Sequence, residues 1–358
     1  MRVLLIKTSS MGDVIHTLPA LTDAQAAIPG IRFDWVVEEN FSEIPLWHPA
    51  VAEVIPVAIR RWRKSPLKTL RSGEWQRFKQ RLKNHKYDLV IDAQGLLKSA
   101  LLTRYAKAPV AGLDSDSARE PLASRLYDQR INVPWGQHAV ERVRQLFAQV
   151  LGYQVPAGTG HYGLNHAYLA GEQSTENYVV FLHGTTWVTK HWPELYWKRL
   201  AQLTVEQGVQ VRLPWGNDAE RARAERIADG IESVQVLPRM PLAGMARILA
   251  GARACVAVDT GLGHLAAALD VPTISLFGPT NPGFTGAYGA VQIHLASDFP
   301  CAPCMSKTCQ YQPTPADAKQ FDLRQELPLC FTRLQPERVM TQLEGLLLES
   351  AGTDGRRC

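Results

Sequence analysis

Residues 254–283 (ACVAVDTGLGHLAAALDVPTISLFGPTNPG) combine an apolar strand, a Gly-rich turn, a helix and a second apolar strand. The turn, DTGLG at residues 259–263, opens the helix. Its backbone N–H groups and the positive end of the helix dipole therefore point at one place. This arrangement suits a phosphate group. The alternative is an ordinary tight connection between a strand and a helix that binds no ligand.

The same turn contains a variant of the dinucleotide-binding fingerprint, Gly261-x-Gly263-x-x-Ala266. That fingerprint expects an acidic residue about 20 residues further on to hold a ribose, and Asn281 stands there instead. The fingerprint also belongs in the first βαβ unit, whereas this one lies late in the chain. We therefore favour a phosphate or pyrophosphate site over an NAD site.

A second candidate phosphate site lies in residues 183–193 (HGTTWVTKHWP), which follow one strand and precede a helix. Thr185 and Thr186 supply hydroxyls, and Lys190 supplies a positive charge. All three groups can donate hydrogen bonds to phosphate oxygens. The alternative is a capped loop with a surface lysine, but the position at the carboxyl end of a strand favours a binding role.

Three acidic positions each allow two interpretations. Asp13 follows the first strand and precedes a helix, where it is either an N-cap or a general base facing a cleft. Glu220 lies at the start of a helix, where it either interacts with the helix dipole or holds ribose hydroxyls. Residues 114–116 (DSD) resemble the Asp-x-Asp metal motif of some sugar transferases, although we favour a turn.

Positive charge is concentrated in residues 60–86, which contain eleven Lys or Arg and one acid, Glu74. This stretch carries +10 against +5 for the whole chain, so the remainder is net acidic. A local concentration of this kind indicates a polyanionic partner at one place. The alternative is a solvated basic helix.

Four of the six cysteines cluster late in the chain, at Cys301, Cys304, Cys309 and Cys330. In a reducing compartment such spacing suggests a metal site, zinc in particular, before a disulfide. The gaps are irregular and the loop is Pro-rich, so free thiols or a redox-sensitive loop remain alternatives.

The chain of 358 residues is 46% hydrophobic and 20% charged, which predicts a globular protein of two domains. Strands alternate with helices, so each domain is expected to be α/β, with a parallel sheet covered on both faces. We expect an N-terminal domain at 1–160, a linker at 161–177, a C-terminal domain at 178–335, and a helix and tail at 336–358. No apolar run approaches the ~18 residues of a membrane span, and MRVLLIKTSSMGD is no signal peptide, so we expect a cytoplasmic protein.

The expected strands lie at 2–7, 33–37, 54–57, 89–92, 110–113, 178–183, 209–214, 234–237, 254–258 and 271–277. The expected helices lie at 14–27 with an interruption at Pro19, through the basic stretch to Lys86, and at 94–105, 139–151, 193–207, 219–228, 242–250, 264–269 and 336–348. Two similar βα architectures in series predict a ligand cleft between them.

Several of these motifs together resemble one family, the lipopolysaccharide heptosyltransferases of type I. The resemblance rests on KTSSMGDVIHTLPAL, FDWVVEE, VIPVAIRRWRK, DAQGLLKSA, SAREPLA, HGTT with KHWPE, LPWG and VDTGLGHLAAALDVP. It covers nearly the whole chain. The segment from Cys301 to Cys330 departs from the best-known members, which are shorter there.

The resemblance implies a GT-B fold of two Rossmann-like domains facing a central cleft. It implies transfer of L-glycero-D-manno-heptose from ADP-heptose to the inner Kdo of Kdo2-lipid A, with inversion and with no metal or other cofactor needed for the chemistry. It places a monomer, bound peripherally, on the cytoplasmic face of the inner membrane.

The resemblance also implies roles for individual residues, with Asp13 as the general base and Lys190 neutralising the ADP leaving group. The implied donor-binding residues are Thr185, Thr186, Lys190, Glu220 for the ribose, Met240 for the adenine, Asp259 for heptose hydroxyls, Thr260, Gly261 and His264. The implied acceptor-binding residues are Arg60, Arg61, Arg63, Lys64 and Arg119, with Trp62 placed to touch the membrane interface.

Two other classes compete with a glycosyltransferase. An NAD-dependent oxidoreductase lacks the acid expected near residue 281. A nucleic-acid-binding protein is expected to show stacking aromatics or a recognised module, and residues 60–86 match none. Acceptor acylation and phosphorylation, oligomeric state and the state of the cysteines are left open by the sequence.

Overall fold

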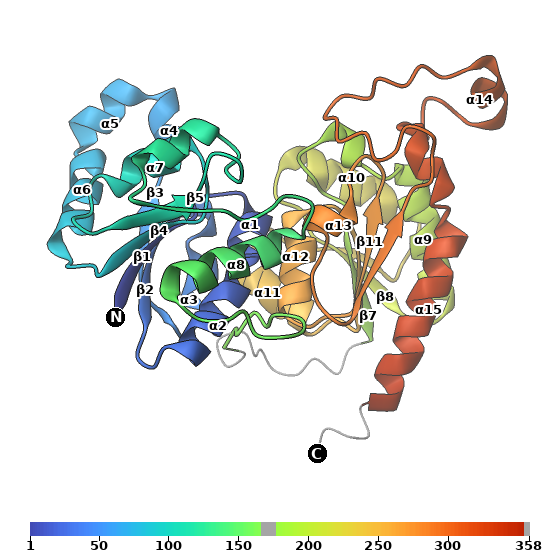
Figure 1. The fold of residues 1–358 in the computed structure, drawn as a ribbon. Helices are drawn as coiled ribbons and strands as arrows, with labels where there is room; N and C mark the ends of the chain where they lie inside the picture. The colour runs from blue at the N-terminus through green and yellow to red at the C-terminus, as the bar shows by residue number, and fades with distance from the viewer. Residues whose placement is uncertain (166–176, 354–358) are drawn as a thin grey trace. The chain divides into compact units, whose positions relative to one another are not determined.

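The computed structural model describes residues 1–165 and 177–353. The chain divides into two compact units, Met1–Tyr168 and Leu169–Cys358. The expected linker at 161–177 lies mostly outside the described residues. Each unit contains one parallel sheet, with helices on both of its faces (Figure 1). The expectation of two doubly wound α/β units is therefore confirmed.

The first unit contains a sheet in the order β3-β2-β1-β4-β5-β6. Its strands are β1 (Arg2–Ile6), β2 (Arg32–Glu38), β3 (Val51–Val57), β4 (Leu89–Asp92), β5 (Val110–Leu113) and β6 (Gln129–Ile131). Its helices are α1 (Met11–Ile15), α2 (Leu18–Ala27), α3 (Glu43–Leu46), α4 (Ile59–Lys64), α5 (Pro66–Ser72), α6 (Glu74–Asn84), α7 (Leu97–Thr103) and α8 (Ala139–Leu151). Phe78 and Leu82 of α6 pack with Leu4 and Ile6 of β1 in one hydrophobic cluster.

The second unit repeats this topology with the order β12-β11-β10-β7-β8-β9. Its strands are β7 (Tyr178–Leu182), β8 (Gln210–Leu213), β9 (Val234–Val236), β10 (Ala254–Val258), β11 (Thr273–Phe277) and β12 (Gln292–Ala296). Its helices are α9 (Glu194–Glu206), α10 (Asp218–Ala228), α11 (Leu242–Ala250), α12 (Gly261–Ala268), α13 (Pro282–Thr285), α14 (Pro315–Gln320) and α15 (Pro336–Thr353). Helix α15 contributes Val339, Leu343 and Leu346 to the core of this unit.

Both sheets reverse their strand order at one point, between β1 and β4 in the first unit and between β7 and β10 in the second. Ligands of open α/β sheets bind beyond the carboxyl ends of the strands at such a switch point. The loops after β1, β4, β7 and β10 are therefore the places to look for chemistry.

The structure corrects four local expectations. The interruption expected at Pro19 lies before it, between α1 and α2, and Pro19 is in the first turn of α2, where its missing N–H costs nothing. The basic stretch forms three helices, α4 to α6, and not one. The DTGLG turn is shorter than expected, because α12 begins at Gly261. The edge strands β6 and β12 were not expected, because their partly exposed residues lack a buried apolar pattern.

Candidate functional site

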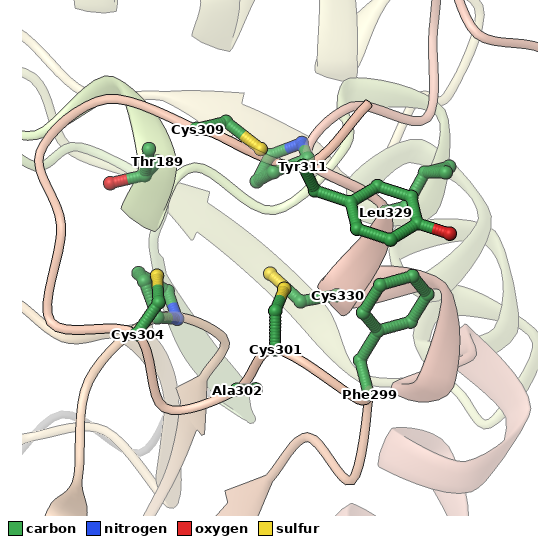
Figure 2. Close-up of a pocket in the computed structure, with 11 residues that line it drawn as sticks. Thr189, Phe299, Cys301, Ala302, Cys304, Cys309, Tyr311, Leu329 and Cys330 are labelled. Atoms are coloured by element: carbon green, nitrogen blue, oxygen red, sulfur yellow. The ribbon is translucent and has the colours of Figure 1, made fainter. Parts of the chain in front are cut away.

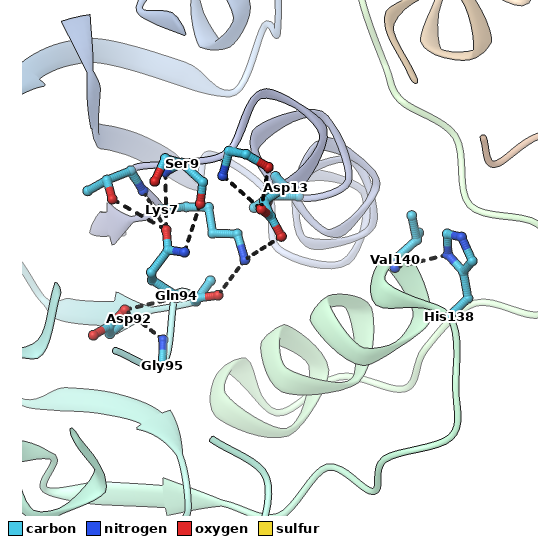
Figure 3. Close-up of polar contacts among 12 residues, drawn as sticks. Lys7, Ser9, Asp13, Asp92, Gln94, Gly95, His138 and Val140 are labelled. Atoms are coloured by element: carbon cyan, nitrogen blue, oxygen red, sulfur yellow. Dashed lines mark hydrogen bonds and ion pairs between the residues drawn. The ribbon is translucent and has the colours of Figure 1, made fainter. Parts of the chain in front are cut away.

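Asp13 lies in α1, directly beyond β1, and its carboxylate is held by the residues around it (Figure 3). The backbone N–H and the hydroxyl of Ser10 both donate to Asp13 Oδ2, each at 2.7 Å. Lys7 Nζ lies 3.9 Å from Oδ1. Asp13 is the third residue of a capping box with Ser10 and not an N-cap, and its side chain is still 39% exposed. The structural role and a chemical role are therefore compatible.

The side chain of Gln94, just beyond β4, fixes the loop that leads into α1 (Figure 3). Its Oε1 accepts from the backbone N–H of Thr8 at 2.9 Å and of Ser9 at 3.2 Å, and its Nε2 donates to Ser9 O at 2.7 Å. Lys7 Nζ donates at 2.9 Å to the backbone carbonyl of Ala93, the residue before Gln94. No role was predicted for Lys7 or Gln94. Their position beyond adjacent strands was the available signal.

Opposing effects act on the titration of Asp13. Burial by itself raises the pKa of the carboxyl. The charge of Lys7, the two hydrogen bonds from Ser10 and the charge of Arg119 all lower this pKa, and together they outweigh the effect of burial. The net pKa of Asp13 lies below its ordinary value. Burial lowers the pKa of Lys7, and the charge of Asp13 opposes that effect. Arg119 therefore acts on the Asp13 carboxylate through its positive charge.

Arg61 is bound to two carboxylates in the first unit. It donates from Nε and Nη2 to Glu39 at 3.1 and 3.0 Å, and Nη1 lies 2.9 Å from Glu74 Oε2. Trp62 donates its indole N–H to Glu74 at 2.8 Å and packs against Trp75 and Phe78. The expectation that Trp62 meets a membrane interface is therefore not supported by its packing.

Arg60, Arg63 and Lys64 are exposed on the same helix, α4. Arg60 and Lys64 line an open cavity of about 340 Å³ with Arg61, Glu38, Glu39, Asn40 and Phe41. Cations and carboxylates face the same space, so the cavity can contact both anionic groups and sugar hydroxyls. It is built from the end of β2, the short 3-10 helix Glu39–Phe41 and helix α4.

In the second unit, Lys190 and Asp259 form an ion pair between the loops that follow β7 and β10. Lys190 Nζ lies 2.7 Å from Asp259 Oδ2, and their side chains are only 14% and 8% exposed. Thr280, beyond β11, donates to the same Oδ2 at 2.8 Å. The Thr185 hydroxyl donates to the backbone carbonyl of Asp259 at 3.0 Å. The structure therefore brings Thr185, Lys190 and Asp259 together at the switch point.

The first turn of α12 continues this site. Thr260 is the N-cap residue and Gly261 the first helical residue. His264 is buried, with Nε2 3.9 Å from Asp259 Oδ1. Lys190 Nζ also lies 4.3 Å from the centre of the Trp187 ring, a contact that was not predicted. Thr186 is exposed.

Glu220 reaches back from α10 to the loops beyond β7 and β8. Its Oε2 accepts from Gly216 N at 2.7 Å, and a Cβ added to Gly184 would lie 2.8 Å from its carboxyl carbon. Glycine at 184 therefore allows the close approach. Met240 lies against Gly244 at the start of α11. Both residues are half-buried.

The acidic cluster at 114–116 is a turn, as favoured. Asp114 Oδ1 accepts from the backbone N–H of Asp116 and Ser117 at 3.1 and 2.8 Å, and Oδ2 accepts from Asn132 at 2.8 Å. The carboxylate is thus used to shape its own loop, and we assign it no metal.

All four late cysteines line one small cavity in the second unit (Figure 2). Cys301, Cys304 and Cys309 are exposed and Cys330 is buried, and none forms a disulfide. Burial raises the pKa of Cys330 to about 12, and the neighbouring thiols act in the same direction. The four cysteines therefore border one small space.

Comparison with known proteins gives one consistent result. Residues 75–314 match the family model "Glycosyltransferase family 9 (heptosyltransferase)". Lipopolysaccharide heptosyltransferase 1 of Pseudomonas aeruginosa is 73% identical, over 97% of this chain and 98% of that protein. The Escherichia coli protein of the same name is 54% identical, over 82% of this chain and 92% of that protein.

Solved structures agree. The E. coli heptosyltransferase WaaC with ADP has a TM-score of 0.84 at 47% identity, covering 97% of this chain and all of that one. The same enzyme with ADP-2-deoxy-2-fluoro heptose has a TM-score of 0.80 at 47% identity, covering 96% and 99%. The expected family and enzyme class are confirmed: the chain belongs to glycosyltransferase family 9, the heptosyltransferases.

Proposed function

We propose that this chain transfers L-glycero-D-manno-heptose from ADP-heptose to the inner Kdo of Kdo2-lipid A, with inversion at the anomeric carbon. The observation that carries the proposal is the Lys190–Asp259 ion pair at the first turn of α12. The names of the relatives and the ADP-based ligands of the related structures support the same donor.

The second unit binds the donor in this proposal. Lys190, the amides at Thr260–Gly261, and His264 neutralise the pyrophosphate, because the helix start and the ammonium favour negative charge. Thr186 is exposed and can donate from its hydroxyl. Thr185 uses its hydroxyl hydrogen on Asp259 O, so it positions that loop.

The sugar and adenosine contacts complete the donor site. Asp259 Oδ2 is occupied by Lys190 and Thr280, which leaves Oδ1 for a heptose hydroxyl. Glu220 holds the ribose hydroxyls, and Met240 lies against the adenine. The buried ion pair with Asp259 orientates the Lys190 side chain before the donor arrives.

The first unit supplies the base. Ser10 occupies Asp13 Oδ2, so Oδ1 accepts the proton of the acceptor hydroxyl while that oxygen attacks the anomeric carbon. The C–O bond to the pyrophosphate breaks in the same displacement, through an oxocarbenium-like transition state. Since the pKa of Asp13 is low, the carboxylate is ionised at neutral pH, and the proton moves as the attacking oxygen becomes acidic.

The acceptor is polyanionic, and the exposed cations of the first unit match it. The lipid A phosphates and Kdo carboxylates contact Arg60, Arg63, Lys64 and Arg119. Arg61 instead anchors helix α4 through its ion pairs with Glu39 and Glu74. We propose a monomer that works peripherally at the cytoplasmic face of the inner membrane. In the described residues, no helix is long and apolar enough to cross a bilayer.

An assay of ADP release tests this function. The purified protein is given ADP-heptose with either Kdo2-lipid A or the already heptosylated acceptor. We expect ADP release and a heptose-bearing product only with Kdo2-lipid A. Transfer only to the heptosylated acceptor would show that the acceptor assignment is wrong.

A further inference from the structure

The four late cysteines belong to a long segment that leaves the second sheet and returns to it. Residues 297–314 follow β12 and form neither helix nor strand. Loops longer than about 12–15 residues with no secondary structure are uncommon in compact domains. The segment then forms α14 and returns at the short 3-10 helix Leu329–Arg333, which brings Cys330 back to the loop. A cross-link or a bound ligand would fix the shape of such a loop.

The space between the thiols is too small for a substrate. The cavity volume is about 20 Å³, which is enough for one water-sized guest. Figure 2 shows the four cysteines placed around it, with Phe299, Tyr311 and Leu329 completing the wall. Sulfur atoms in an otherwise apolar wall form a ligand set for a single soft or borderline metal ion.

We propose that Cys301, Cys304, Cys309 and Cys330 bind one Zn²⁺ as a closed, structural four-thiolate site. Cys301-x-x-Cys304 is the pair spacing of structural zinc sites, and the other two ligands come from the same loop and from its return point. Each thiol loses its proton to the solvent on binding, so four thiolates and one Zn²⁺ leave a site charge of −2.

The thiols must turn inward to reach this geometry. Among the described residues, the set whose ligand atoms already lie within 4.8 Å of one another is Asp34, Glu53 and His85. Arg2 already pairs with Asp34 at 2.7 Å, and Arg81 pairs with Glu53. These carboxylates therefore need no metal cation to neutralise them. Three of the four clustered cysteines are exposed, so their side chains can rotate.

The proposed zinc site supports the loops that hold Lys190. Thr189 donates its hydroxyl to Ser306 O at 2.8 Å, and Met305 N donates to Pro279 O at 2.8 Å. Thr189 precedes Lys190, and Pro279 precedes Thr280, which holds Asp259. An ordered cysteine loop therefore fixes the ion pair from two sides. This positioning role, unlike the metal site itself, rests on the proposed function.

Metal analysis of the full-length protein tests the site. Protein purified without chelators and under reducing conditions is expected to hold about one zinc per chain, released in step with titration of four thiols by a mercurial reagent. The variants Cys304→Ser and Cys309→Ser are expected to lose zinc affinity by more than the roughly 10–100-fold that an outer-sphere partner contributes. Cys255→Ala, which removes a buried thiol of β10 outside the cluster, is the matched control and keeps the metal.

Three outcomes would overturn the assignment. They are a wild-type protein without stoichiometric metal and with four freely reactive thiols, iron in place of zinc, or a disulfide within the cluster. Replacement by Co²⁺ gives a readout independent of variant folding, because tetrahedral four-thiolate Co²⁺ absorbs visible light intensely, whereas six-coordinate Co²⁺ absorbs it only weakly.

A donor-binding measurement separates the two proposals. Loss of zinc is expected to weaken ADP binding and to lower the melting temperature. If the metal is present and ADP-heptose is not a donor, the zinc site stands and the proposed function fails. If a zinc-free wild-type protein transfers heptose from ADP-heptose normally, the proposed function stands and the proposed zinc site fails.

Discussion

Lys190 Nζ lies 2.7 Å from Asp259 Oδ2, and both side chains are nearly buried. The two residues come from loops beyond β7 and β10, the neighbouring strands at which the strand order of the second sheet reverses. A buried pair contributes little net stability, but removal of one partner leaves the other charge uncompensated. A substitution of either residue is therefore expected to affect donor binding also through the uncompensated charge of its partner.

Lys190→Ala is expected to weaken ADP binding by about 10–100-fold, because one charged hydrogen bond is lost and Asp259 remains as an uncompensated negative charge. Calorimetry of ADP binding measures this. In the double variant with Asp259→Asn, the loss should be smaller than in Lys190→Ala alone. An unchanged ADP affinity in Lys190→Ala would remove Lys190 from the donor site.

Asp13→Asn is expected to reduce turnover by about 10²–10⁴-fold, the usual contribution of a general base. Its amide oxygen can still accept from Ser10, so the capping box and the melting temperature should change little. ADP-heptose affinity should be unaffected, because the donor residues lie in the other unit. Near-normal turnover with Kdo2-lipid A would show that Asp13 is not the base.

The pH profile follows from the lowered pKa of Asp13. A depressed carboxyl pKa keeps the group ionised down to values below its ordinary 3.8. The acid limb that Asp13 contributes to kcat/KM should therefore lie below pH 3.8, and Ser10→Ala should move it upward by removing one of the two hydrogen bonds. The same sign applies to stability: the contribution of Asp13 is complete above its unfolded pKa and disappears as the pH falls through the folded value. A limb near neutral pH that shifts in Ser10→Ala would contradict this assignment.

Neutralising Arg60, Arg63 and Lys64 together is expected to raise the acceptor KM and to weaken its salt dependence, because these exposed cations meet an anionic acceptor. Arg61→Ala should instead lower the melting temperature, since Arg61 connects Glu39 and Glu74. Steady-state kinetics with varied acceptor and salt, beside thermal unfolding, distinguish the two. An acceptor KM that stays constant in the triple variant would place the acceptor elsewhere.

The family, the two α/β units and the loops that carry the candidate site are predictable from the residues alone. Buried parallel strands read as continuous apolar runs, and the loops at their carboxyl ends are marked by Gly, Thr and charged residues. The motifs at DTGLG and HGTT were therefore recognisable without coordinates. The edge strands β6 and β12 were not recognisable, because their apolar patterns are weak. These segments form strands only by pairing with β5 and β11 of the sheets.

Tertiary structure decided which side chains are already paired. Three examples depend on contacts between segments far apart in the chain. Lys190 pairs with Asp259, Arg61 pairs with Glu39 and Glu74, and Gln94 fixes the loop before Asp13. Local sequence encodes the type of each residue and its position on an element. Distances between elements depend on how the whole sheet twists and packs, and these distances decide which charges neutralise one another and which remain for a substrate.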